Sequence, residues 1–292
     1  MNTHTRASDR ESLPQMPNRL GLDGIEFVEY ATDRPQALGQ VLEMMGFRPV
    51  ARHRSREVIL FRQGGMNLLV NAHVDDARLT SAAEGPVISA VGFKVRDARQ
   101  AHERCLELGA WDAPSRSRAM ELNIPAIYGP GGSRFHFVDG HDRFSIYDID
   151  FVAIPTVDPW PDAIAGSEYF GVVQYVGTNR SGDWIAFFEE MFGFLLIPDD
   201  ERFGILPAGK LMRSPCRRFM WQLVEPYPRG ETDAGPETLR RIGLGVADVG
   251  AAVAALRGRG VEFVDAEILH PEDRGALTRT MLGSVAFELV HR

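Results

Sequence analysis

The segment GIEFVEYATDRPQALGQVLEMMGF, residues 24–47, decides the fold because the chain contains the same pattern a second time. Its counterpart is GVVQYVGTNRSGDWIAFFEEMFGF, residues 171–194, and the two align without a gap. Each copy predicts a strand, a polar turn and an amphipathic helix that ends in Gly-Phe. The predicted buried faces of these helices are Leu38, Val41, Leu42 and Met45 in the first copy and Trp184, Phe187, Phe188 and Met191 in the second.

The expected ends of both helices also repeat. Asp33 and Asp183 precede the helical segments and suit the N-cap position, where a side-chain oxygen accepts a hydrogen bond from a backbone N–H. Gly46 and Gly193 follow them, which is typical of a left-handed C-terminal cap. The two segments therefore predict two copies of one structural unit.

A second pair of matching segments, residues 91–110 and 242–261, again predicts a strand, a turn and a helix. Gln63-Gly64-Gly65 predicts a hairpin turn. The expected core positions of these helices are Ala101, Cys105 and Leu108 in the first and Val253 and Leu256 in the second. Further strands are predicted at Val58–Arg62, Met66–Val70, Arg134–Val138, Ser145–Phe151, Arg217–Leu223 and Thr280–His291.

Each half of the chain thus consists of two strand–helix–strand–strand–strand units, which predicts an α+β fold. Two such units pair to form an open, cup-shaped sheet. The chain is therefore expected to contain two barrels in tandem, each built from a pair of βαβββ units. The predicted boundaries are a disordered tail at 1–20, a first domain at 21–151, a linker rich in proline at 152–169 and a second domain at 170–292.

Composition narrows the classes of function. The formal net charge is -8, and an acidic surface repels phosphate backbones, so we expect no nucleic-acid partner. No apolar run approaches the length that spans a membrane, so we expect no membrane association. Cys105 and Cys216 are too few for a disulfide framework, which favours a reducing cytoplasm.

The chain resembles the 4-hydroxyphenylpyruvate dioxygenases, a family of the vicinal-oxygen-chelate superfamily. In the first half the resemblance is carried by HRSREVILFRQGGMNLLVN (53–71), the segment 91–110, MELNIPAIYGPGG (120–132) and SIYDIDFV (145–152). In the second half it weakens to the repeated unit pattern and the last strand, GSVAFELVHR (283–292).

This resemblance implies that the first half is a structural barrel without metal. It implies that the second half holds Fe(II) between two histidines and one carboxylate, with positions open for a 2-oxo acid and O2. The register of the motifs puts Gln174 and Arg241 at the two histidine positions and keeps Glu288 as the carboxylate. No histidine occurs between His141 and His270, so a shift of register restores neither one.

Two interpretations of Arg241 and Glu288 remain open. They form a salt bridge that fills a former metal site, or Arg241 binds the carboxylate of a 2-oxo acid in a bidentate manner. Gln174 is then expected to orient a ligand oxygen or to hydrogen-bond Glu288, and Phe287 to contact the ligand. His270 lies in a polar segment from which it could serve as a replacement metal ligand.

These observations support three hypotheses of function. In the first, the chain is a divergent family member that binds an aromatic 2-oxo acid or similar small carboxylate through Arg241, with no cofactor. In the second, it is an active dioxygenase that holds Fe(II) or another divalent metal through Glu288, Gln174 and His270. In the third, it is a non-catalytic structural or interaction protein. The family resemblance also implies a homo-oligomer.

Overall fold

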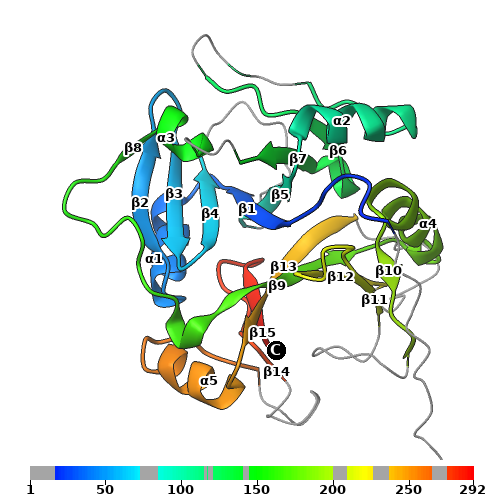
Figure 1. Ribbon diagram of the computed structural model, residues 1–292. Coiled ribbons are helices and arrows are strands. Elements are labelled where there is room, and N and C mark those ends of the chain that lie inside the picture. Colours follow the sequence, from blue (N-terminus) through cyan, green and yellow to red (C-terminus); the bar gives the residue numbers. More distant parts are fainter. Residues whose placement is uncertain are drawn as a thin grey trace, which may run out of the picture.

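The computed structural model describes residues 17–72, 85–114, 117, 121–140, 145–199, 209–225, 237–264 and 275–292. In these ranges the chain forms two mixed β-sheets flanked by helices, which confirms the predicted α+β class (Figure 1). No helix in these ranges is long and apolar enough to cross a membrane. The predicted N-terminal tail falls almost entirely outside them.

The first sheet has eight strands in the order β6-β7-β5-β1-β4-β3-β2-β8. Its central strand β1 pairs in parallel with β4 and antiparallel with β5, which joins the two units of the first half. The elements are β1 (Gly24–Ala31), α1 (Pro35–Met44), β2 (Arg48–His53), β3 (Val58–Gln63), β4 (Met66–Asn71), β5 (Val87–Val95), α2 (Ala98–Glu107), β6 (Ala126–Tyr128), β7 (Arg134–Asp139), α3 (Ile146–Asp150) and β8 (Phe151–Ala153).

The second sheet has seven strands in the order β10-β11-β12-β9-β13-β15-β14. Its central strand β9 pairs in parallel with β12 and antiparallel with β13, as β1 does with β4 and β5, so the repeat in the sequence is also a repeat in topology. The elements are β9 (Glu168–Tyr175), α4 (Ser181–Phe187), β10 (Leu195–Leu196), β11 (Lys210–Arg213), β12 (Met220–Val224), β13 (Thr238–Val246), α5 (Val249–Arg257), β14 (Gly275–Leu277) and β15 (Ala286–His291).

Both predicted aspartate caps are wrong. The N-cap of α1 is Arg34, because the helix starts at Pro35, whose missing N–H is no loss in the first turn. Helix α4 starts at Ser181, so Asp183 lies inside its first turn. The prediction for Gly193 is confirmed: it caps the second helix in the left-handed conformation, with a φ of 71°.

The buried face of α1 is confirmed, but that of the second helix is shifted. After Phe187 the chain widens into one π-helical turn, Phe188–Phe192, which adds a residue per turn. Phe188 stays in the core, and Phe192 is buried where Met191 was expected. Trp184 and Phe187 are partly buried against the same core.

The other two helices largely confirm the prediction. Ala101 and Cys105 of α2 are buried, whereas Leu108 lies at the C-cap and is exposed. In α5, Leu256 is buried and Val253 packs against the core from its edge.

Most predicted strands occur, and one prediction is wrong. In place of the strand predicted at Ser145–Phe151, the chain forms the short helix α3, because Ser145 and Asp148 make a reciprocal capping box, and β8 begins only at Phe151. The turn at Gly64 and Gly65 joins β3 to β4 as predicted. The two C-terminal strands are shorter than expected, since Arg217 and Leu282 adopt positive φ in turns before β12 and β15.

The two halves share one hydrophobic core. Phe93 of β5 and Phe135 of β7 pack against Trp221 of β12, with ring centroids 6.1 and 5.4 Å apart. The guanidinium of Arg259, after α5, donates to backbone carbonyls at the end of α1. The two halves therefore pack together along one apolar interface, and their division into two separate domains stays a prediction.

Candidate functional site

Arg241 and Glu288 come together on one face of the second sheet. Strands β13 and β15 run parallel, with Arg241 opposite Ala286 and Gly243 opposite Glu288. Side chains alternate between the faces of a strand, so both residues point away from the helix-covered side. The Arg241 Nη2 lies 4.0 Å from the Glu288 Oε2, and their side chains are 7% and 3% exposed. The predicted pair is therefore present and buried.

A second arginine joins this pair through an irregularity of the sheet. The pairing of β13 with β9 shifts between Leu239 and Arg241, so Arg240 is an extra residue in a β-bulge. The guanidinium carbons of Arg240 and Arg241 lie 5.8 and 5.9 Å from the ring centroid of Tyr175 on β9. Two guanidinium groups thus lie near one tyrosine ring.

The buried nitrogens of these arginines are incompletely paired within the part of the chain that the structure describes. The Nε of Arg240 and the Nε and Nη2 of Arg241 have no hydrogen-bond partner. The 4.0 Å ion pair to Glu288 is too long to count as a hydrogen bond. Buried donors without partners cost free energy, so this cluster is suited to an anion with several acceptor oxygens.

Gln174 lies on the other face of the sheet. It is opposite Leu239 and next to Leu223 in the strand register, and both of these residues belong to the hydrophobic core. Its side chain is fully buried, and its Oε1 accepts a hydrogen bond of 2.8 Å from the Trp221 Nε1. The structure therefore does not bring Gln174 beside Arg241 and Glu288.

Phe287 is also separated from the pair. It neighbours Glu288 in sequence, so it points to the opposite face, where it packs with Ile242 and Leu289 in the core. His270 lies outside the described residues, so its position relative to Glu288 stays a prediction.

The position of β9 that shares the row of Glu288 is a glycine. Glu288 lies opposite Gly243, and Gly243 lies opposite Gly171. A Cβ at Gly171 would come within 2.1 Å of the Met220 carbonyl oxygen, so no side chain fits there without a backbone shift. Among the described residues, no group of three or more His, Cys, Asp or Glu side chains could hold a metal ion.

Sequence reasoning missed Arg240 and Tyr175. The Arg-Arg pair was visible in the sequence, but regular alternation would put Arg240 on the opposite face from Arg241. Only the bulge turns both guanidinium groups toward Tyr175, and no residue pattern announced that bulge.

The fold and the repeated units are those of the vicinal-oxygen-chelate proteins. The N-terminal region of the hydroxyphenylpyruvate dioxygenase family matches residues 16–152. A 4-hydroxyphenylpyruvate dioxygenase of Pseudomonas aeruginosa is 31% identical over 267 residues, which cover 85% of this chain and 72% of that protein. The chain belongs to the 4-hydroxyphenylpyruvate dioxygenase family.

Two further relatives show how far the similarity extends. A 4-hydroxyphenylpyruvate dioxygenase of Pseudomonas sp. strain P.J. 874 is 40% identical over 179 residues. The match covers 61% of this chain and 50% of the length of that protein. A mutant 4-hydroxymandelate synthase from Streptomyces coelicolor superimposes with a TM-score of 0.72 at 17% identity, covering 93% of both chains. That second similarity shows the fold alone.

Proposed function

We propose that the second half of this protein binds an aromatic 2-oxo acid or a similar small carboxylate through Arg241, without the Fe(II) site of its family. The observation that carries the proposal is that buried guanidinium nitrogens of Arg240 and Arg241 have no hydrogen-bond partner among the described residues, although Arg241 is ion-paired with Glu288. A planar guanidinium matches the two oxygens of a carboxylate, and each charged hydrogen bond contributes about 1.5–3 kcal/mol.

The donor set at this place does not fit a site of two histidines and one carboxylate. A guanidinium has no lone pair for a metal, and the amide of Gln174 lies on the other face of the sheet. Only Glu288 has the chemistry of an Fe(II) ligand among the three positions that the family resemblance indicated. In the proposed site, Glu288 holds Arg241 in place, and Arg240 adds a second positive charge.

Binding can be measured by isothermal titration calorimetry with 4-hydroxyphenylpyruvate and phenylpyruvate, in buffer that contains a metal chelator. The wild-type protein is expected to bind, and Arg241→Met is expected to weaken binding by about 10- to 150-fold, the equivalent of one charged hydrogen bond. Arg279→Met, which removes an exposed arginine of the same half, is the matched control. Equal affinity of the wild type and Arg241→Met would refute the proposal.

The second candidate is a metal-dependent dioxygenase with an altered ligand set. It is favoured by the family membership and by the buried carboxylate of Glu288. Elemental analysis after expression in iron-replete medium tests it. Stoichiometric metal that disappears in Glu288→Ala would replace the first proposal and call for a turnover assay on 4-hydroxyphenylpyruvate.

A non-catalytic interaction protein is the remaining hypothesis. It predicts neither bound metal nor binding of a 2-oxo acid. The homo-oligomer that the resemblance implied is checked by sedimentation analysis of the full chain.

A further inference from the structure

The first half contains a cavity of its own, on the concave face of the first sheet. Its volume is about 160 Å³, and polar and apolar side chains share its lining. For comparison, an apolar cavity of about 150 Å³ in another protein takes up benzene. The cavity therefore has room for one six-membered ring.

A carboxylate and a guanidinium line this cavity from the same face of the sheet, with a small residue between them. Glu29 of β1 lies opposite Ala90 of β5, and Ala90 lies opposite Arg134 of β7, so the three side chains form one row on the same face. Strands are about 4.8 Å apart, so the backbones of Glu29 and Arg134 are about 10 Å apart. Glu29 and Arg134 both line the cavity. Ala90, with its short side chain, lies between them in the row.

Each charged group is held for binding in a different way. The Oε1 of Glu29 accepts hydrogen bonds from the Ser89 Oγ at 2.7 Å and the Asn71 Nδ2 at 3.4 Å, which orient the carboxylate. The Nε of Arg134 is buried and has no hydrogen-bond partner among the residues that the structure describes. Arg134 also lines the cavity, and a guanidinium is suited to a carboxylate ligand.

An aromatic wall stands beside this row. Phe27 lies over Gly92, where a Cβ would come within 2.4 Å of the Phe27 ring. The ring centroids of Phe27 and His136 are 5.8 Å apart with a tilt of 44°. Leu69, at the end of the row next to Glu29, adds an apolar surface. Flat apolar walls of this kind favour an aromatic ring.

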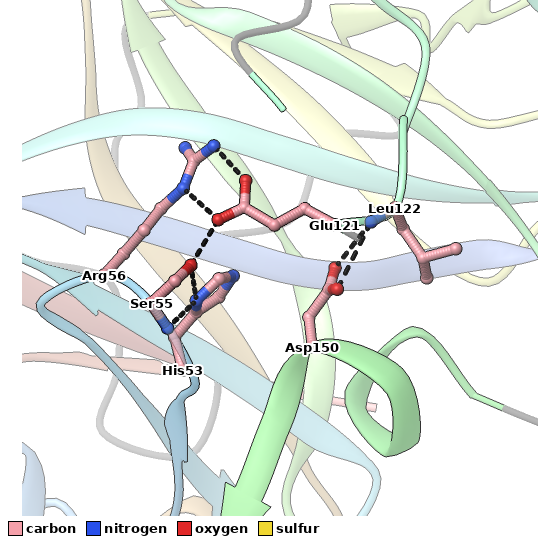
Figure 2. Close-up of polar contacts among 6 residues, drawn as sticks. All are labelled: His53, Ser55, Arg56, Glu121, Leu122 and Asp150. Carbon is pink, nitrogen blue, oxygen red and sulfur yellow. Dashed lines mark hydrogen bonds and ion pairs between the residues drawn. The ribbon is translucent and has the colours of Figure 1, made fainter. Parts of the chain in front are cut away.

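A short strap, formed by Glu121 and Leu122, lines the cavity. Hydrogen bonds hold it in place (Figure 2). The Glu121 carboxylate accepts from the Arg56 Nε at 3.1 Å and also from the Ser55 hydroxyl. The Leu122 N–H donates to the Asp150 carboxylate at 3.2 and 3.3 Å. These contacts attach the strap to the loop after β2 and to the end of α3, which shapes the wall of the cavity.

We propose that this cavity is a second ligand site, which takes a small single-ring aromatic acid that carries a hydroxyl group. The carboxylate binds Arg134, the ring lies over Ala90 beside Phe27, and the hydroxyl donates to Glu29. The site is independent of Arg241, so the proposed function of the second half can fail while this site stands.

The test uses the full chain with Arg241→Met, which removes the second-half site, and 4-hydroxybenzoate as the probe in calorimetry. One equivalent is expected to bind, and adding Arg134→Met is expected to weaken binding at least tenfold. In the Arg241→Met background, 4-hydroxybenzoate is expected to bind more tightly than benzoate. Glu29→Gln should shrink that preference about fivefold, because a neutral amide is a weaker acceptor than a carboxylate.

Two further variants guard against a folding defect. Arg134→Lys keeps the charge but loses the planar fork, and Ala90→Leu fills the floor while it leaves both charged groups in place. Both are expected to weaken binding with an unchanged circular dichroism spectrum. If the Arg241→Met protein binds no 4-hydroxybenzoate, or if a folded Ala90→Leu protein binds it as before, the proposal is overturned.

Discussion

The pair of Arg241 and Glu288 predicts a specific pattern of stability changes. Both side chains are almost fully buried, and their charged atoms are 4.0 Å apart. At an effective dielectric constant of about 20, two unit charges at this distance attract by about 4 kcal/mol. Removing one partner leaves the other buried charge without this attraction, which costs about 3–5 kcal/mol. Removing both leaves no such charge and costs much less.

The assay is urea unfolding of the wild type, Arg241→Met, Glu288→Met and the double variant, followed by tryptophan fluorescence and circular dichroism. Each single variant is expected to lose about 3 kcal/mol of unfolding free energy, and the double variant far less than twice that amount. Arg240→Met, at a half-buried neighbour, is the control and should lose about 1 kcal/mol. Additive losses in the double variant would refute the reasoning, because the two charges would then be uncoupled.

Three other properties can be checked independently. In urea unfolding, Gly171→Ala is expected to lower the unfolding free energy by about 3 kcal/mol, because its Cβ would overlap a carbonyl of β12. Gly182→Ala, in open space on α4, should raise it by about 0.5–1 kcal/mol in the same assay. Burial raises the pKa of Cys105 to about 12, so at pH 8 only Cys216 should react with a thiol reagent, and fast reaction of both thiols would contradict this burial. Because the thiol ionises at lower pH in the unfolded chain, the unfolding free energy should also fall as the pH rises from about 9 to 12. Ser145→Ala removes the capping box of α3 and should cost about 1 kcal/mol in urea unfolding, with no loss if the cap is unimportant.

The sequence by itself determined the repeated architecture. Two gapless copies of a strand–turn–helix segment predicted two copies of one structural unit, and in the structure β1 and β9 have equivalent neighbours in their sheets. Helical periodicity predicted the buried face of α1, and the Gly-Gly pair predicted the turn from β3 to β4. The helix face and the turn depend on contacts between residues that are close in sequence, so local patterns are sufficient to predict them.

Apart from the pair of Arg241 and Glu288, which the family resemblance already implied, the tertiary structure decided which side chains meet in the candidate sites. One extra residue in a strand exchanges its two faces, so the bulge at Arg240 brings two arginines together beside Tyr175. Gln174 could face either way by sequence, because both sides of β9 are apolar, and its bond to Trp221 fixes it in the core. The row of Glu29 and Arg134 joins strands more than 100 positions apart, a pairing that no local pattern encodes.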